Sequence, residues 1–212
     1  NKRRGLWRVL TTLKRIEGGW VNNVGLRNGG VQSVPNLKDT IISFSALEEQ
    51  DWCFALPQLK LRDKVMGLEI NISCPNVGVK NIPKKKIQEI KDSFKNVIVK
   101  TPHHTSLCDL IKLADLGFDY IHVSNTAPSE IGAISGLSLV EKNLRTISKI
   151  KSFRPSVKII GGGGIYTMET LKKYENVGAD HFSLSTLLLN PIKTRKLINQ
   201  YYLNYSKKSN SP

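Results

Sequence analysis

Residues 68–73 alternate between apolar and polar side chains along the sequence Leu-Glu-Ile-Asn-Ile-Ser. A period of two is the pattern of a β-strand with one face buried. Pro75 follows, and because proline has no backbone N–H it ends the hydrogen-bonded ladder. The pattern therefore predicts a buried strand whose far end presents two carboxamides and a thiol, at Asn71, Asn76 and Cys74.

Strands of this kind recur along the chain and alternate with segments of helical character. The strands are expected at residues 40–44, 67–73, 96–100, 119–123, 157–160 and 181–185. The helices are expected at about residues 46–56, 83–95, 105–116, 139–152, 167–176 and 191–204. Strict alternation of strand and helix indicates a parallel sheet.

The position of the glycine-rich loop favours a barrel over an open doubly wound sheet. An open sheet usually carries its phosphate loop after the first strand. Here Gly161–Gly164 follow the fifth strand and Ser185-Thr186 end the sixth, and phosphate held by the loops after the last two strands is typical of a barrel. We therefore expect an α/β fold, namely a (β/α)8 TIM barrel that is incomplete, with about six βα units present and its first two strands missing.

The whole chain, residues 1–212, is expected to form a single domain. It would have a basic N-terminal segment at 1–20 and a disordered tail at 205–212. Four apolar residues of the N-terminal segment would share one face of a short helix: Trp7, Val9, Leu10 and Leu13. Gly18-Gly19 would end that helix, and the density of Asn and Gly over residues 20–30 indicates a loop with unusual backbone angles.

Composition narrows the class of protein. Hydrophobic residues make up 40% of the chain and charged residues 23%, which fits a globular protein. No apolar run is long enough to span a bilayer, and the N-terminus lacks the pattern of a signal peptide. Three cysteines without a Cys-x-x-Cys pair suggest neither disulfides nor zinc, so we expect a reducing, cytoplasmic setting. The chain begins with Asn1 instead of Met, as a fragment or a processed form would.

The net charge of +15 favours anionic ligands. The basic residues are spread along the chain and do not interleave with aromatic residues, so we expect no specific nucleic-acid binding. His103-His104 has no third ligand at a suitable spacing, and we expect no metal site.

Several polar residues at expected strand ends suggest a ligand on one face of the barrel. Lys100 ends an apolar strand, either as a surface lysine or as a cation facing the edge of a bound ring. The glycine run would bring the backbone close to a phosphate, with Thr167 capping the next helix. Carboxamides suit a planar heterocycle with amide-like edges, and the chain offers four: Asn22, Asn71, Asn76 and Asn125. Taken alone, Cys74 could equally be a buried structural cysteine.

Six motifs in order resemble those of the dihydroorotate dehydrogenases, the FMN enzymes of pyrimidine synthesis. The resemblance runs from about Trp20 to Pro191. Its motifs are Asn22-Asn23-Val24-Gly25-Leu26, the Asn71–Asn76 signature, Lys100, Asn125-Thr126, the loop Ile134-Ser135-Gly136 and the loop Ile159–Ile165. Cysteine at position 74 is similar to the soluble class 1 enzymes, whereas class 2 enzymes carry serine there.

The resemblance implies FMN as cofactor and a reaction in which Cys74 removes the C5 proton of dihydroorotate while the C6 hydride passes to FMN. The implied cofactor-binding residues are Asn71, Lys100, Ser124, Gly136, Gly163, Gly164, Ser185 and Thr186. The implied binding residues for dihydroorotate or orotate are Asn22, Val24, Gly25, Leu26, Asn71, Asn76, Asn125 and Thr126. A homodimer is also implied, with fumarate or an NAD-linked partner subunit as electron acceptor.

The sequence departs from the family pattern at three points. The family has a lysine at the end of its second strand, upstream of this sequence; Ser185 stands where the family usually has glycine; and Ala133 replaces a glycine. Two alternatives remain open, a flavoprotein acting on another pyrimidine, as dihydropyrimidine dehydrogenase does, and an inactive barrel or basic binding protein.

Overall fold

The computed structural model describes residues 12–23, 29–72, 84–124 and 126–209, with side chains to residue 205. Six of the residues expected at the site lie outside these ranges: Val24, Gly25, Leu26, Cys74, Asn76 and Asn125. So do Trp7, Val9 and Leu10.

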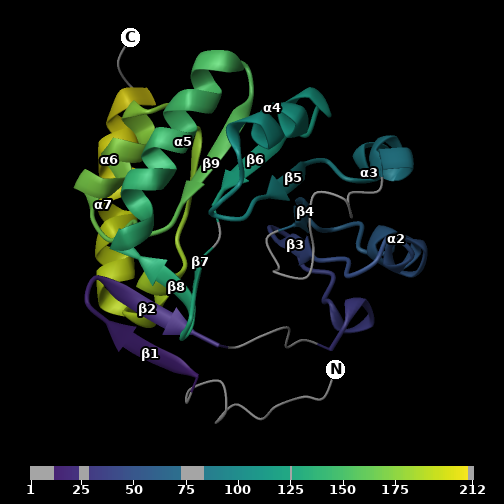
Figure 1. Ribbon diagram of the computed structural model, residues 1–212, viewed down its shortest axis with the longest axis horizontal. Helices are drawn as coiled ribbons and strands as arrows, with labels where there is room; N and C mark the ends of the chain where they lie inside the picture. Colours follow the sequence, from purple (N-terminus) through teal and green to yellow (C-terminus); the bar gives the residue numbers. More distant parts are fainter. Residues whose placement is uncertain (1–11, 24–28, 73–83, 125, 210–212) are drawn as a thin grey trace.

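A six-stranded parallel sheet forms the centre of the molecule, in the order β10-β9-β6-β5-β4-β3 (Figure 1). Its strands are β3 (Ile41–Phe44), β4 (Gly67–Asn71), β5 (Val97–Lys100), β6 (Tyr120–Val123), β9 (Lys158–Gly162) and β10 (His181–Ser183). All five pairings between neighbouring strands are parallel. The expected incomplete (β/α) barrel with six βα units is confirmed.

A helix follows each strand of this sheet. The helices are α2 (Asp51–Lys60), α3 (Ile87–Ser93), α4 (Leu107–Asp115), α5 (Val140–Phe153), α6 (Met168–Asn176) and α7 (Pro191–Ser209). Figure 1 shows α5, α6 and α7 gathered beside β9, with α2 and α3 at the opposite end of the sheet. The first helix begins at Asp51 instead of 46, and the last runs to Ser209, past its expected end at 204.

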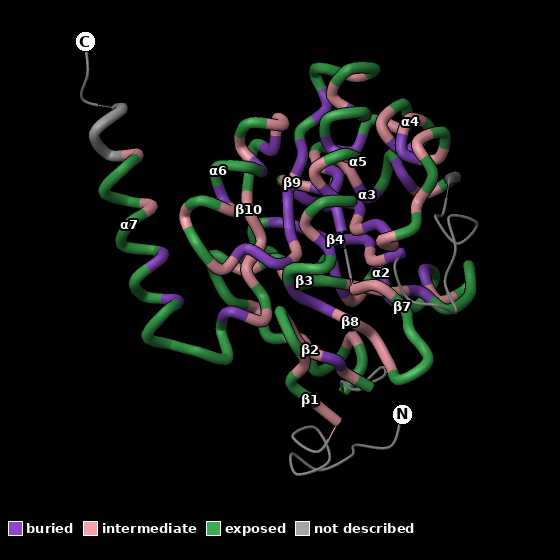
Figure 2. Tube along the Cα trace, turned by 60° about the vertical axis from the view of Figure 1, so that its left-hand side comes forward, coloured by how far each residue is buried: buried purple, intermediate pink, exposed green. Residues whose placement is uncertain are grey.

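The core lies between the sheet and the helices. Alternate strand residues point outward and are fully or almost fully buried, as the purple strands in Figure 2 show; examples are Leu68, Val97, Val99, Ile121 and Ile159. They pack in one cluster with helix residues such as Leu56, Leu113 and Ile147. Burial of apolar area is the main term that stabilises such a layer.

A second, antiparallel sheet covers one end of the barrel, in the order β1-β2-β8-β7. Its strands are β1 (Leu13–Ile16), β2 (Gly19–Asn22), β7 (Ala127–Ser129) and β8 (Gly132–Gly136). Two expectations were wrong here. Leu13 lies in a strand and not in a helix, and Ile134-Ser135-Gly136 is a strand and not a loop.

Glycines permit the close contact between β2 and β8. A Cβ on Gly19 would lie 2.1 Å from the carbonyl oxygen of Ser135, and Gly18 has a φ of 68°, which allows the tight turn after β1. Where a helix was expected to end, Gly18 therefore lies in the turn of a hairpin and Gly19 begins β2.

Candidate functional site

A hollow opens at the carboxyl ends of β5, β6, β9 and β10; its cavity volume is about 50 Å³, within about 470 Å³ of space that includes its open mouth. It brings together six residues of the expected cofactor set: Lys100, Ser124, Gly163, Gly164, Ser185 and Thr186. Thr126, from the expected substrate set, lines it too. Residues from four strand ends therefore surround one space, as barrel geometry requires.

Three other described residues of the expected set lie outside the lining of this hollow. Asn71 ends β4 directly beside Lys100 in the strand register and is half-buried. Gly136 packs behind the hollow, against Gly164. Asn22 lies on β2, where its carboxamide donates to the carbonyl oxygen of Ala133 at 3.2 Å.

The glycine loop after β9 has the backbone of an anion cradle. Gly163 and Gly164 have φ values of 94° and 73°, a region that residues with a side chain rarely adopt. A Cβ on Gly164 would lie 2.5 Å from the carbonyl oxygen of Gly136, so no larger residue fits. The next helix begins with Thr167, whose hydroxyl accepts from the Thr170 N–H at 3.2 Å, as the expected cap.

The donor set of the hollow fits a phosphate-bearing cofactor such as FMN. Because Gly163 and Gly164 have no side chains, a phosphate can come close to their backbone. The N-terminus of the helix that follows, α6, favours negative charge. Hydroxyls come from Ser185 and Thr186 on the neighbouring loop, and the Tyr166 and Thr186 hydroxyls share a hydrogen bond of 2.9 Å that joins the two loops. Lys100 adds a cation on the opposite side of the lining.

A buried asparagine, which the sequence interpretation missed, holds the glycine loop from behind. Asn143 on α5 is 1% exposed and donates to the Gly162 carbonyl oxygen at 2.8 Å. Its own carbonyl oxygen accepts from the Ser124 hydroxyl at 2.9 Å. Tyr174 on α6 donates to the Gly163 carbonyl oxygen at 2.8 Å, and burial raises the pKa of this tyrosine to about 12.

His103 belongs to this hydrogen-bonded group. Its Nδ1 lies 3.2 Å from the Asn143 carbonyl oxygen, and burial lowers the pKa of its imidazole. Among the described residues, no three His, Cys, Asp or Glu side chains come together as a metal site would need.

A second missed feature is a carboxylate–imidazole pair inside the barrel. Glu69 on β4 and His122 on β6 are joined by a 2.8 Å contact between Oε2 and Nδ1, and Ser43 donates to Oε1 of Glu69 at 2.7 Å. Since the serine bonds to the carboxylate and not to the imidazole, this is not the arrangement of a Ser-His-Asp nucleophile. His122 itself lines the hollow.

Opposing effects act on the two ionisable groups. Burial alone would raise the pKa of the Glu69 carboxyl, but the hydrogen bond from His122, the charge of Lys100 and the hydrogen bond from Ser43 outweigh it and lower that pKa. Burial lowers the pKa of His122, with a further contribution from Lys100, although the bond to Glu69 opposes both. Glu69 is therefore ionised and His122 neutral at pH 7.

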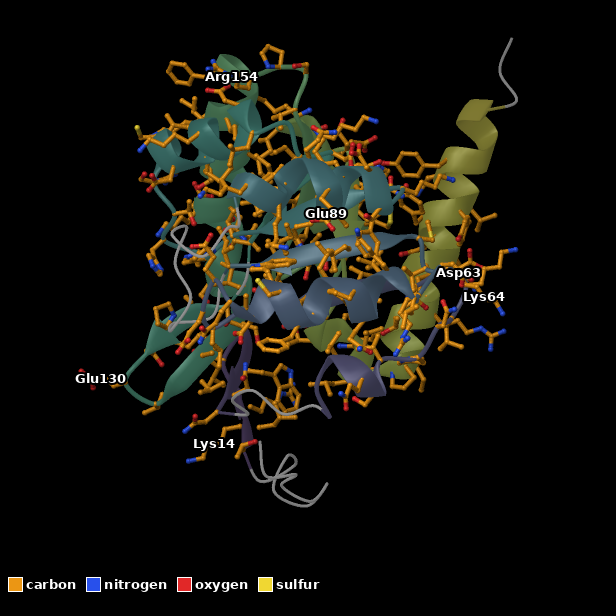
Figure 3. The ribbon with its side chains drawn as sticks, turned by 90° about the vertical axis from the view of Figure 1, so that its right-hand side faces the viewer. Lys14, Asp63, Lys64, Glu89, Glu130 and Arg154 are labelled. Carbon is orange, nitrogen blue, oxygen red and sulfur yellow. The ribbon has the colours of Figure 1, made fainter. Side chains whose placement is uncertain are left out.

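Charged side chains elsewhere lie on the periphery. Figure 3 shows Lys14 on β1 and Glu130 at the tip of the β7–β8 hairpin, and both are exposed. Cys53 and Cys108 are exposed free thiols. No described helix is long and apolar enough to cross a membrane.

Fold and site together define a (β/α) barrel with a hollow at the carboxyl ends of its strands. Comparison with known proteins gives the family. The chain is 31% identical to the catalytic subunit of dihydroorotate dehydrogenase B (NAD(+)) from Oceanobacillus iheyensis, over 86% of this chain and 71% of that protein. It is 26% identical to the subunit of the same name from Bacteroides fragilis, over 89% of this chain and 77% of that protein.

A further relative is dihydroorotate dehydrogenase A (fumarate) from Lactobacillus delbrueckii subsp. bulgaricus, 27% identical over 78% of this chain and 65% of that protein. The fold is similar to a crystal structure of a dihydroorotate dehydrogenase in complex with ferulenol from Eimeria tenella. The TM-score is 0.72 and the identity 17%, over 91% of this chain and 69% of that one. No family model matches the chain.

The chain belongs to the dihydroorotate dehydrogenase family, and is thus a member of a family of oxidoreductases. The expected family is confirmed, and its relatives include both class 1 types, B and A.

Proposed function

We propose that this chain binds FMN in the hollow and oxidises dihydroorotate to orotate in de novo pyrimidine biosynthesis. The observation that carries the proposal is the convergence of Lys100, Ser124, the glycine cradle and the Ser185-Thr186 hydroxyls on one space. Lys100, the glycine run and Ser185-Thr186 were selected from their positions at expected strand ends, and Ser124 from the family resemblance; together they come from four separate strand ends.

Different residues of the hollow would bind different parts of the cofactor. Gly163 and Gly164, with the start of α6, would hold the phosphate together with the hydroxyls of Ser185 and Thr186. Lys100 would face the electron-rich edge of the flavin ring and stabilise negative charge on it. When bound, FMN would supply the acceptor for the hydride from C6 of dihydroorotate.

Six residues of the substrate side of the site, Cys74 among them, lie outside the described ranges. Cys74 would remove the C5 proton as a thiolate, so that proton and hydride leave from adjacent carbons and a C5–C6 double bond forms. The carboxamides of Asn22, Asn71, Asn76 and Asn125 would bind the pyrimidine edges, with Thr126 and the loop Val24-Gly25-Leu26 completing the pocket. A homodimer and a cytoplasmic setting remain predictions, as does the choice between fumarate and an NAD-linked acceptor.

The test follows flavin reduction in the purified chain reconstituted with FMN. Anaerobic addition of dihydroorotate should bleach the flavin absorbance band. Cys74→Ser should slow this bleaching by about 100-fold or more at neutral pH, because a positioned general base contributes roughly that much. Cys108→Ser, which changes an exposed thiol on α4, is the matched control and should bleach at the normal rate.

Two results would contradict the proposal. A bound flavin that dihydroorotate does not reduce would remove dihydroorotate as the substrate. An unchanged rate in Cys74→Ser would instead remove Cys74 as the base while leaving the substrate assignment in place.

A further inference from the structure

The Glu69–His122 pair spans the inner face of the barrel beneath the hollow. Glu69 lies on β4 and His122 on β6, and β5, which ends in Lys100, runs between them. Their side chains are 11% and 7% exposed, so an ionised carboxylate here needs compensation. Both of its oxygens are satisfied, one by Ser43 and one by His122.

The ionised carboxylate fixes the tautomer of the imidazole. Glu69 can only accept hydrogen bonds, so Nδ1 of the neutral His122 carries the proton and Nε2 is a bare acceptor. Nε2 lies against Gly162 on β9, where a Cβ would approach it to 3.0 Å. Among the described residues Nε2 has no hydrogen-bond partner. His122 is only 6% exposed, and it lines the hollow.

Lys100 is the cation that this pair faces. It lies directly opposite His122 in the strand register and lines the same hollow. Its charge acts on both Glu69 and His122, yet within the described part of the chain it forms no ion pair with Glu69. Glu69 lies on the same face of the neighbouring strand and is held by other donors, which leaves the ammonium available to a ligand.

We propose that the ionised carboxylate of Glu69, held in place by His122 and Ser43, moderates the positive charge that Lys100 presents to the hollow. The consequence concerns the reduced cofactor, because negative charge on the flavin ring is stabilised by Lys100 and opposed by Glu69 behind it. The pair therefore sets how strongly the site favours reduced over oxidised FMN. This inference rests on the proposed function.

The principal experiment is Glu69→Gln in the full chain loaded with FMN, with the midpoint potential and the affinity for oxidised FMN measured together. The glutamine oxygen can still accept from Nδ1 of His122, and its amide can donate to the Ser43 hydroxyl, so the substitution removes the charge and reverses one hydrogen bond. The potential should rise, by an amount equal to about tenfold tighter binding of reduced relative to oxidised FMN, or about 30 mV for a two-electron couple. The affinity for oxidised FMN should stay within about threefold, because the oxidised ring is neutral.

A double-mutant cycle with Lys100→Gln tests whether the two charges oppose each other at the flavin. Lys100→Gln should lower the potential, and the double variant should lie between the two single variants. An unchanged or lowered potential in Glu69→Gln would overturn the moderating role. Glu89→Gln, at an exposed carboxylate on α3, is the control and should leave the potential unchanged.

A measurement on the flavin-free chain separates the two proposals. Nitrogen-15 NMR of the histidine rings at neutral pH should show His122 with its proton on Nδ1 and a bare Nε2. A proton on Nε2 would overturn the pair even if FMN binds and dihydroorotate reduces it. Failure of the wild-type chain to bind FMN would overturn the proposed function and, with it, the effect on potential, while the NMR result would still decide the arrangement of the two side chains.

Discussion

The two faces of the parallel sheet are built from the same strands but differ in chemistry. On β6, Ile121 points outward and is fully buried against the helices, while His122, the next residue, points into the barrel and lines the hollow. On β4, Ile70 likewise points outward and Glu69 points into the barrel. A period of two thus lets one short strand supply both the hydrophobic layer and the site.

The difference shows where stability and chemistry come from. Outward residues need only fit an apolar layer, so size and shape decide the outcome of a substitution. Inward residues carry polar groups in a partly buried space, so each needs a partner, as Glu69 finds in His122 and Ser43. Substitutions on the outer face should therefore cost unfolding free energy, and those on the inner face should alter ligand binding or titration.

The largest loss of stability is expected from Ile121→Ala on the outer face. Deleting a fully buried isoleucine side chain removes apolar contact and leaves a cavity, so the free energy of unfolding should fall by about 3–4 kcal/mol. Urea denaturation followed by circular dichroism measures it. Leu61→Ala, at a residue that is 65% exposed, should stay within about 0.5 kcal/mol of wild type. Equal losses in the two variants would mean that β6 does not lie against the helix layer.

Asn143→Leu should have the next largest effect on stability, because it removes the side chain that holds the glycine loop. The leucine is similar in size but cannot bond to the Gly162 carbonyl oxygen or the Ser124 hydroxyl, which would leave both buried without this partner. We expect a loss of about 2–3 kcal/mol in unfolding free energy and FMN binding weakened about tenfold, which corresponds to ~1.4 kcal/mol.

Asn176→Leu, at an exposed position on α6, is the matched control for that substitution and should change neither quantity appreciably. Isothermal titration with FMN and urea denaturation give the two readings. If Asn143→Leu lost stability but bound FMN normally, the loop would not depend on Asn143 for its geometry.

Most of the fold could be predicted from the sequence because the parallel strands are apolar runs of adequate length, each followed by a helical pattern. The predicted strand at 96–100 differs from β5 by one residue at its start. The antiparallel sheet could not be predicted in the same way. β1 has the sequence Leu-Lys-Arg-Ile, which is too short to show a period, and β2 pairs with β8, more than a hundred residues away along the chain.

The same distinction, between local pattern and contacts with distant elements, applies to the residues of the site. Lys100, Ser124 and Thr186 could be selected from the sequence because each lies at or just after the end of an expected strand. Glu69, His122 and Asn143 were missed because their roles depend on partners on other elements. A signal was present, since Glu69 and His122 interrupt otherwise apolar strands, and a charged residue is rarely buried without a partner. Identifying that partner requires the order of strands in the sheet.

The smallest expected effect is on the pH dependence of stability, which distinguishes inward-facing from outward-facing residues of the sheet. The pKa values of His122 and His103 are both lowered in the folded chain, mainly by burial. The unfolded chain therefore takes up protons at a higher pH than the folded one. Stability should be fully present above about pH 6.5 and fall below it, by at most ~1.4 kcal/mol per pH unit for each group. Glu69, whose pKa is lowered from 4.5, loses its contribution only at lower pH.

Thermal unfolding of His122→Gln between pH 7 and pH 5 isolates the inner-face histidine. Glutamine does not titrate, so the variant should lose less stability across this interval than wild type, with the remaining slope due in part to His103. Ile121→Ala provides the comparison from the adjacent residue on the opposite face. It should be less stable at every pH but keep the wild-type slope, because it removes packing and no proton-binding group. If His122→Gln also kept that slope, the imidazole would have the same pKa in the folded and the unfolded chain. That result would contradict the burial of His122 beside Glu69 on the inner face.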